Sequence, residues 1–341
     1  MCAGRRMILW KLLSIAGGLA FLGLAYWTIS PTFRSDGPET SGTDATPLAT
    51  PVGTAGPTDP VLVGAGDIAS CAQENDEKTA GLLDQVVGTT AESGAETVVF
   101  TAGDNAYESG TIEEYEQCYG PTWGRHKDRT RPATGNHEYA LGNADGHFQY
   151  FGEAAGKPGA GYYSFDLGTW HVIVLDTGDH CQIVACAVGS AQEQWLRADL
   201  AASRAFCTVA IWHDPLFTSG PRGSSARYLL PFWRALYEFG ADIVVNGHEH
   251  NYERFAPQTA EGLLDTAQGV RQFVVGTGGN GHRSLGDPRA PHSEVADDAT
   301  YGVIQLTLHP AGYDWEFIPV AGETFGDSGS GDCHGAPSAP S

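Results

Sequence analysis

The sequence is poor in basic residues, which occupy 19 of its 341 positions against 41 acidic ones, for a formal net charge of −22. Four of the basic residues fall within positions 1–34, where there is no acid, so the remainder is more acidic than the whole. A surface of this sign repels nucleic acid and anionic lipid. We therefore expect no nucleic-acid partner. A phosphate-bearing substrate would need a local positive charge, and bound metal ions are the obvious source.

The sequence also lacks one common cysteine motif and one common asparagine motif. The absence of any Cys-x-x-Cys pair argues against zinc held by thiolates, and the absence of Asn-x-Ser/Thr leaves no N-glycosylation signal. Six cysteines follow the N-terminal segment, and an even number outside a reducing compartment indicates disulfides, of fifteen possible pairings. Short spacing favours Cys181 with Cys186. Cys207 with Cys333 would tie the tail to the body, and Cys71 with Cys118 would brace two loops.

Residues 1–30 contain an apolar segment without a polar face. Arg5 and Arg6 precede the largely apolar residues 7–29, which predicts either a cleaved signal peptide or an N-terminal membrane anchor. Basic residues on the N-terminal side predict that the following chain is translocated. We expect a secreted or membrane-anchored protein whose folded domain lies outside the cytoplasm, attached to a membrane, if at all, through residues 7–29 only.

Large apolar residues are almost absent from residues 31–59, which are rich in Pro, Thr, Gly and Ser and predict a disordered linker. This segment is too short for an additional β-sandwich, so we expect a single folded domain over residues 60–322. Residues 323–341 are rich in Gly, Ser and Pro and are expected to be a loose tail, apart from any bond at Cys333.

Short apolar runs that end in Gly, Asp, Asn or His predict buried strands that lead into functional loops, at 61–65, 97–102, 171–176, 207–212, 242–245 and 272–275. Helical patterns lie between several of them, at 76–87, after a capping box of Ser190 and Glu193, and at 226–239, where Pro231 is expected to kink the helix. This succession predicts an α/β fold. Residues 301–308 and 313–318 predict a hairpin in a second sheet, with 161–167 a candidate strand of the same sheet.

Five loops near the predicted strands carry residues that can bind metal. The loops are Gly66-Asp67, Gly103-Asp-Asn-Ala-Tyr107, Gly135-Asn-His-Glu138, Trp212-His-Asp214 and Gly247-His-Glu-His250. Taken singly, each has an ordinary reading as a turn or a strand end. Loops at the carboxyl ends of strands in an open α/β sheet converge on one crevice, however, so the five can meet there.

The oxygen and nitrogen donors of these loops suit two metal ions better than one. The candidate ligands are Asp67, Asp104, Tyr107, Asn136, His213, His248 and His250. One carboxylate, Asp104, would bridge the two ions. Two metals about 3.5–4 Å apart can hold a hydroxide nucleophile and clamp a phosphoryl group for in-line attack.

From Val61 to Ile318 the chain resembles the calcineurin-like metallophosphoesterases and, within them, the purple acid phosphatases in a single-domain form. Most metallophosphoesterases have Asp-x-His after the first strand, whereas this chain has Ala69 and offers Tyr107 instead, which is the purple acid phosphatase arrangement. The resemblance implies a two-sheet β-sandwich flanked by helices (α/β/β/α). It assigns Asp67, Tyr107 and His250 to the first metal and Asn136, His213 and His248 to the second, bridged by Asp104.

The resemblance also suggests the metals and the chemistry. A tyrosine phenolate is a hard anion, so Tyr107 favours Fe(III) with a second divalent ion (Fe, Zn or Mn), which leaves the site slightly positive where two divalent ions would leave it neutral. His137 is the candidate for stabilising the transition state or protonating the leaving oxygen. Family members often have a further histidine in the loop after the His213 motif; this chain does not, which leaves Arg222 as the candidate substrate contact.

These features predict an exported dinuclear-metal phosphatase that hydrolyses small phosphomonoesters by attack of a metal-bound hydroxide on phosphorus. One alternative is a phosphodiesterase or nucleotide phosphohydrolase that uses the same site, because the sequence does not define the pocket walls. Another is a surface binding protein with a vestigial metal site, although every ligand position is filled.

Overall fold

A computed structural model describes residues 59–221 and 223–335. The predicted signal or anchor, nearly all of the predicted linker, Arg222 and residues 336–341 lie outside the described residues. Within the described ranges, no helix is both long enough and apolar enough to cross a bilayer.

Most strands of the described chain form two sheets. In spatial order, the first sheet consists of β15 (Asp327–Asp332), β14 (Gly312–Pro319), β13 (Gly302–His309), β1 (Val61–Ala65), β3 (Thr97–Ala102) and β5 (Thr130–Ala133). The second consists of β12 (Ser293–Asp297), β10 (Tyr252–Phe255), β11 (Arg271–Val275), β9 (Ile243–Asn246), β8 (Cys207–Ile211), β7 (Trp170–Val174) and β6 (Tyr163–Leu167). The two-residue strands β2 (Ala69–Ser70) and β4 (Ala106–Tyr107) pair in parallel beside them.

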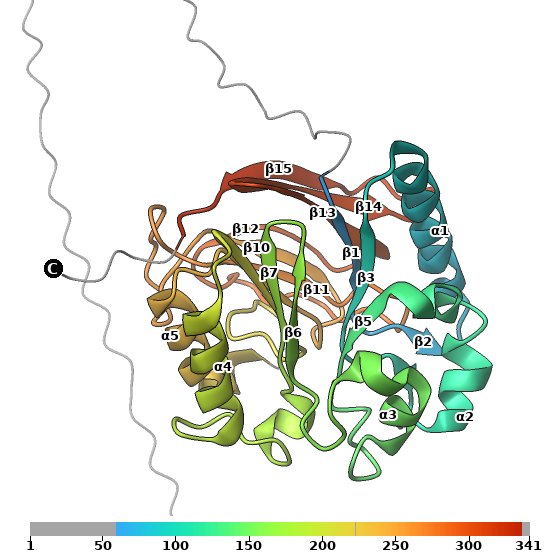
Figure 1. The fold of residues 1–341 in the computed structure, drawn as a ribbon. Coiled ribbons are helices and arrows are strands. Elements are labelled where there is room, and N and C mark those ends of the chain that lie inside the picture. The colour runs from blue at the N-terminus through green and yellow to red at the C-terminus, as the bar shows by residue number, and fades with distance from the viewer. Residues whose placement is uncertain (1–58, 222, 336–341) are drawn as a thin grey trace, which may run out of the picture. The chain divides into compact units, whose positions relative to one another are not determined.

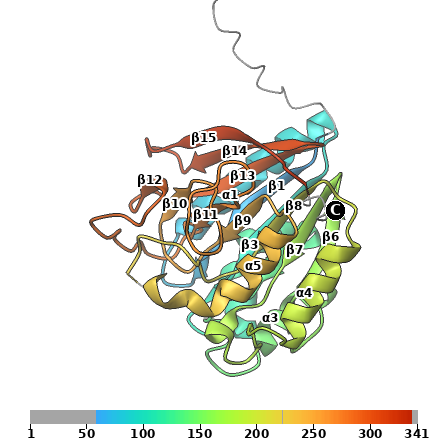
Figure 2. The same ribbon diagram turned by 90° about the vertical axis from the view of Figure 1, so that its left-hand side faces the viewer.

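The helices are α1 (Asn75–Ser93), α2 (Ile112–Glu114), α3 (Asp145–Phe151), α4 (Ala191–Ala202) and α5 (Leu230–Glu238), with short helices η1 (Tyr115–Tyr119), η2 (Trp123–Arg129), η3 (Gly152–Ala155), η4 (Gly178–Cys181) and η5 (Gly223–Leu229). Helix α1 lies against the first sheet, and α4 and α5 lie against the second (Figures 1 and 2). This arrangement confirms the expected two-sheet α/β/β/α sandwich.

The central strands are apolar throughout because both of their faces are buried. Along β8, Val209 and Ile211 belong to the core between the sheets, whereas Ala210 and the following Trp212 pack toward α4 and α5. Successive side chains of a strand point to opposite faces, so a strand covered on both sides needs an unbroken apolar run.

The structure corrects the predicted sheet membership of residues 161–167. Strand β6 pairs antiparallel with β7 in the second sheet, whereas the β13–β14 hairpin belongs to the first. Only Gly168 and Thr169 separate β6 from β7, and Gly168 has a φ of 58°. A two-residue turn with a glycine at positive φ favours pairing of neighbouring strands, which is a stronger signal than the alternation used to assign the sheet.

Two further predictions about local structure were wrong, and one strand was not predicted. The predicted loose tail contains β15, the edge strand of the first sheet, over residues 327–332. Pro231 does not kink a long helix, because it stands in the first turn of α5, where a proline has no hydrogen bond to lose. No strand was expected at β5, whose Pro132 is tolerated because β5 is the other edge of that sheet.

The predicted disulfides Cys71–Cys118, Cys181–Cys186 and Cys207–Cys333 are all present. The predicted cap of α4 is also present, since the Ser190 side chain accepts the Glu193 N–H. The Glu193 carboxylate accepts from Gly189 N–H, one residue before the position that a capping box requires.

His171, buried on β7, leads to a prediction about stability and pH. Its Nε2 and Nδ1 bond Asp199 at 2.8 Å and Asp166 at 3.0 Å. Burial disfavours the charged ring, but these hydrogen bonds outweigh it and raise the pKa of His171 above 6.5. The added stability is therefore complete below pH 6.5, the pKa in the unfolded chain, and is lost as the pH rises through the folded pKa. We expect His171→Gln to destabilise the fold by about 1.5–3 kcal/mol at acid pH and by less at alkaline pH.

Denaturant unfolding of the wild type and His171→Gln at several pH values would measure this gap. In an Asp199→Asn background, the stability difference between the chain with His171 and the chain with His171→Gln should lose most of its dependence on pH, because the Asp199 side chain is largely shielded from water. Asp166→Asn should change it little, because that side chain is 76% exposed and its charge is screened. A gap independent of pH would contradict the prediction.

Candidate metal centre

All five candidate loops leave the carboxyl ends of parallel strands. In the first sheet β1, β3 and β5 run parallel, and in the second β8 and β9 do. The loops after these strands bring together the seven predicted ligand side chains, which lie far apart in the sequence. They are Asp67, Asp104, Tyr107, Asn136, His213, His248 and His250.

Three of these side chains form one group, which Asp104 contacts through Tyr107. Tyr107 Oη lies 2.9 Å from Asp67 Oδ1, 3.0 Å from Asp104 Oδ2 and 3.4 Å from His250 Nε2. His250 Nε2 is in turn 3.1 Å from Asp67 Oδ1. The four donor atoms therefore surround a small common volume.

The other three side chains form a second group. Asn136 Oδ1 lies 3.0 Å from His248 Nδ1 and 3.2 Å from His213 Nε2, and the two histidine nitrogens are 3.2 Å apart. Asp104 Oδ2 is 3.2 Å from His213 Nε2. The same carboxylate oxygen thus contacts both groups, as a bridging ligand must.

Backbone carbonyls determine which ring nitrogen faces the site in two of the histidines. His213 Nδ1 donates to Ala102 O at 2.7 Å, and His250 Nδ1 donates to Gly281 O at 2.5 Å. A carbonyl oxygen only accepts, so both rings must carry a proton on Nδ1, and Nε2 is the nitrogen that faces the donor groups. This is the usual outer support of a metal-bound histidine.

The electrostatics of the donor set require added positive charge. Burial opposes ionisation of Asp104, but the neighbouring His213 and His137 keep the pKa of this carboxyl below its usual range. Burial and the nearby Asp104 and Asp67 carboxylates hold the pKa of Tyr107 well above 10. A phenolate beside two carboxylates is stable only with a cation among them, so the residues fit a pair of metal ions.

The backbone around the site is sterically demanding. Asp67, Asp104 and His248 have φ values of 60°, 51° and 67°, a backbone conformation that is uncommon for residues other than glycine. In the last loop the positive φ falls on His248 and not on the preceding Gly247. Gly247 is needed for another reason, since a Cβ there would lie 2.7 Å from both Ala102 O and Asp67 Oδ2.

Glu138 interacts with the backbone of the loop that carries Asp104. Its buried carboxylate accepts the backbone N–H groups of Asp104 at 2.9 Å, Asn105 at 2.8 Å and Gly135 at 2.7 Å. The loop that carries Asp104 is therefore fixed by three hydrogen bonds to one side chain.

His137 lies at the edge of the two donor groups. Its backbone N–H donates to Asp104 Oδ1 at 2.8 Å, its Nδ1 donates to Glu108 O at 2.6 Å, and its ring lies 4.3 Å from the Tyr107 ring, centroid to centroid. Its Nε2 lies 3.8 Å from Asp104 Oδ2. The other predicted contact, Arg222, lies outside the described residues.

The sequence analysis missed His180, which lies beside the second donor group. Its Nδ1 is 3.0 Å from Asp214 Oδ1, and ring nitrogens of His180 and His248 lie within 4.8 Å of each other. The hydrogen bond to Asp214 outweighs burial and raises the pKa of His180. His180 follows the predicted strand 171–176 but belongs to no metal motif, so only this position and the neighbouring Cys181 in a short disulfide loop could have drawn attention to it.

Comparison with known proteins matches this chain to phosphoesterases. The family described as calcineurin-like phosphoesterase matches residues 62–252. An uncharacterized protein of Mycobacterium tuberculosis is 28% identical over 183 residues, covering 43% of this chain and 35% of that protein. Purple acid phosphatase 15 of Arabidopsis thaliana is 31% identical over 158 residues, covering 43% of this chain and 28% of that protein. The matches therefore span about a third of the length of these curated relatives.

Among solved structures, the purple acid phosphatase PPD1 of yellow lupin (Lupinus luteus) superposes with a TM-score of 0.66. The superposition covers 80% of this chain and 53% of the lupin chain at 19% sequence identity. The two proteins therefore share a fold.

Proposed function

The chain belongs to the calcineurin-like phosphoesterase family, and on that premise we propose that it is a dinuclear-metal phosphatase that hydrolyses small phosphomonoesters. The observation that carries the proposal is the position of Asp104 Oδ2, which lies 3.0 Å from Tyr107 Oη and 3.2 Å from His213 Nε2. One oxygen shared by two groups of donors is the arrangement that a pair of metal ions requires.

Asp67, Tyr107 and His250 would hold one ion, and Asn136, His213 and His248 the other, with Asp104 between them. Two ions bound there supply an activated water and neutralise charge on the phosphoryl group. The protein's own contribution is to fix the donors: Glu138 holds the Asp104 loop, and backbone carbonyls orient His213 and His250. Because these side chains are already in position, they need little reorganisation during the reaction.

His137 is the proposed catalytic residue. Its side chain is 22% exposed, whereas that of Asp104 is only 2% exposed, so the imidazole can meet a substrate at the entrance to the site. From there it can contact the phosphoryl group or protonate the leaving oxygen.

We propose Fe(III) at the Tyr107 position with a divalent partner. Replacing Tyr107 by Phe removes the phenol oxygen, so we expect the purified wild type to show a visible phenolate-to-iron charge-transfer band and Tyr107→Phe to lose it. Absorption spectra with metal analysis would measure this. Tyr115→Phe is the matched control, because Tyr115 also donates to a buried carboxylate, Glu138, at 3.0 Å, and it should keep the band. A colourless wild type loaded with zinc or manganese would contradict the iron assignment.

Activity on small esters tests the proposed function. The metal-loaded protein should hydrolyse p-nitrophenyl phosphate faster than bis(p-nitrophenyl) phosphate. The reverse preference would favour the phosphodiesterase alternative. A metal-loaded protein inactive on every phosphate ester would overturn the proposed function and leave a binding protein with a vestigial site.

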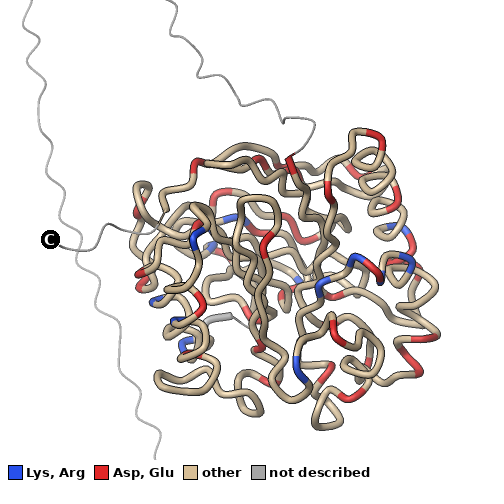
Figure 3. The backbone as a smooth tube through the Cα atoms, in the orientation of Figure 1, with Lys and Arg blue, Asp and Glu red and all other residues tan. Residues whose placement is uncertain are grey.

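We also propose that the protein is exported. The Cys71–Cys118, Cys181–Cys186 and Cys207–Cys333 disulfides support this, because such bonds persist in oxidising compartments and are rare in the cytosol. The apolar residues 7–29 are the proposed signal or anchor. Figure 3 marks acidic residues in red at many positions along the backbone of the fold and fewer basic residues in blue. The charge of the protein itself therefore attracts anions little away from the metal site.

A further inference from the structure

We propose that His180 binds a phosphate oxygen of the substrate or product beside the second metal position, and that the Cys181–Cys186 disulfide holds it there. The inference rests on the proposed function and adds to it a binding residue from a separate part of the fold. His180 lies in η4, which follows β7, whereas the proposed metal ligands lie on the five loops after other strands.

The side chain of His180 bridges the buried site and solvent. Its Nδ1 donates to Asp214 Oδ1 at 3.0 Å, and its ring packs edge-on against the ring of His248, with centroids 5.4 Å apart. The Asp214 side chain is only 3% exposed, whereas that of His180 is 42% exposed. One edge of the imidazole is thus fixed by a buried carboxylate, and the rest of the ring faces outward next to a proposed metal ligand.

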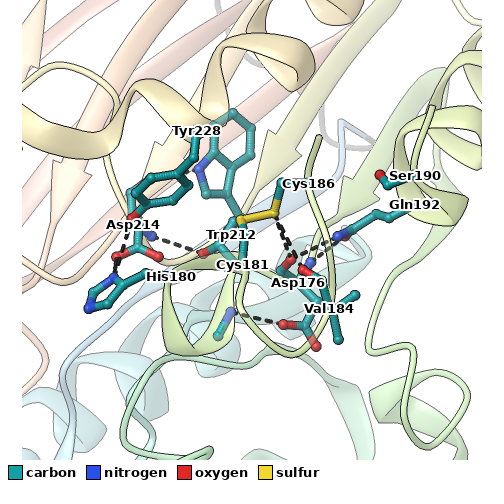
Figure 4. Close-up of a disulfide and its surroundings, with 12 residues drawn as sticks. Asp176, His180, Cys181, Val184, Cys186, Ser190, Gln192, Trp212, Asp214 and Tyr228 are labelled. Carbon is teal, nitrogen blue, oxygen red and sulfur yellow. Dashed lines mark hydrogen bonds and ion pairs between the residues drawn. A yellow bond between two sulfur atoms is a disulfide. The ribbon is translucent and has the colours of Figure 1, made fainter. Parts of the chain in front are cut away.

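The second ring nitrogen is available to a ligand. Figure 4 shows His180 with one nitrogen directed at Asp214 and the other directed away from it. Among the described side chains, no hydrogen bond is made by Nε2; Tyr228 Oη, the other close group, lies 3.3 Å from Nδ1. A nitrogen at this place can bond a phosphate oxygen held at the second metal position.

The backbone at His180 needs an outside restraint. Asp179, His180 and Cys181 have φ values of 49°, 54° and 63°, three consecutive residues in the left-handed region without a glycine. Such a run is unfavourable for L-residues and persists only where the surroundings impose it. The disulfide from Cys181 to Cys186 is the covalent part of that restraint.

The far end of the disulfide is anchored in the core. Cys186 is buried, with its sulfur 3.8 Å from Asp176 O. Asp176 is itself held by Gln192, which accepts its N–H at 2.7 Å and donates to its carbonyl at 2.8 Å, and by Tyr139 Oη, which donates to its carboxylate at 2.5 Å. Figure 4 shows this chain of contacts from Gln192 through Asp176 and the disulfide to His180. The disulfide therefore connects His180 to the hydrogen-bonded segment around Asp176, which follows β7.

Binding of inorganic phosphate to the metal-loaded protein, measured by calorimetry, tests the inference without relying on turnover. His180→Asn is the informative variant, because asparagine tolerates positive φ but lacks the imidazole. We expect its phosphate Kd to rise about tenfold or more, with metal content unchanged and KM raised more than kcat falls. His180→Gln has a longer side chain than His180→Asn, so its amide N–H can reach closer to the position of Nε2. It should therefore recover part of the affinity.

The role of the disulfide is tested by a double-mutant cycle. Cys181→Ser with Cys186→Ser should weaken phosphate binding, and adding His180→Asn to that pair should weaken it little further, because both changes remove the same contact. Cys207→Ser with Cys333→Ser is the control for the loss of a disulfide elsewhere and should leave the Kd unchanged. Fully additive effects would overturn the positioning role of the disulfide.

The outcomes separate this inference from the proposed function. An unchanged phosphate Kd in His180→Asn overturns the inference, even if the wild type is an active phosphatase. Loss of metal from this variant also overturns it, since His180 would then support the metal site through Asp214 and His248. A wild type that hydrolyses no ester but binds phosphate in a His180-dependent manner would refute the proposed function and support the inference. A metal-loaded wild type that binds no phosphate would overturn the inference.

Discussion

Asp104→Asn is expected to lose bound metal and phosphatase activity together. Asp104 Oδ2 contacts both donor groups, lying 3.0 Å from Tyr107 Oη and 3.2 Å from His213 Nε2, and the side chain is almost fully buried. An amide of the same shape keeps one oxygen but removes the negative charge that offsets two cations. We expect metal content to fall at both positions and activity to drop about a thousandfold or more. Metal analysis alongside the rate on p-nitrophenyl phosphate would measure both effects.

A matched control separates loss of the bridge from general damage. Asp327→Asn replaces another shielded aspartate. Asp327 lies on the edge strand β15 and bonds Arg254 at 2.7 Å. It should reduce stability through the lost ion pair but leave metal content and specific activity near the wild-type values. If Asp104→Asn kept both metals, or lost only one of them, the proposed bridge would be wrong.

Most of the loops that carry the candidate ligands follow strands that could be recognised independently, and for this reason the sequence could predict that their side chains lie close together. The strands 61–65 and 97–102 were predicted with the bounds of β1 and β3, and the rule that strand ends converge placed Asp67 and Asp104 near each other. His248 and His250 follow β9 in the same way. Local patterns were sufficient here because the function requires polar residues where the apolar run stops.

The sequence was a poor guide where a residue's environment depends on distant contacts. Glu138 is three residues after Gly135, yet its partners include the backbone of Asp104 and Asn105, more than thirty positions earlier. His180 reaches the site only because a disulfide, a left-handed backbone and Asp214 from another loop combine to place it. No spacing rule encodes such a combination, so neither role could be predicted.

His137→Ala should separate catalysis from metal binding. The contact between His137 and Asp104 Oδ1 is made by the backbone N–H at 2.8 Å and survives removal of the side chain. The bridge should therefore stay in place and both metals should remain bound. Activity should fall about a hundredfold, because the imidazole that contacts the phosphoryl group or the leaving oxygen is gone.

The dependence of that loss on the leaving group distinguishes the two roles of His137. If the imidazole protonates the leaving oxygen, the rate ratio between wild type and His137→Ala should grow from aryl to alkyl phosphates, because poorer leaving groups need the proton more. If it stabilises charge on the phosphoryl oxygens, the ratio should be similar for all esters. His309→Ala, which removes a partly buried histidine that bonds Asp59 and Asp314 away from the site, should leave the rates unchanged. Full activity in His137→Ala would exclude both roles, and loss of metal would show that the side chain acts on the bridge instead.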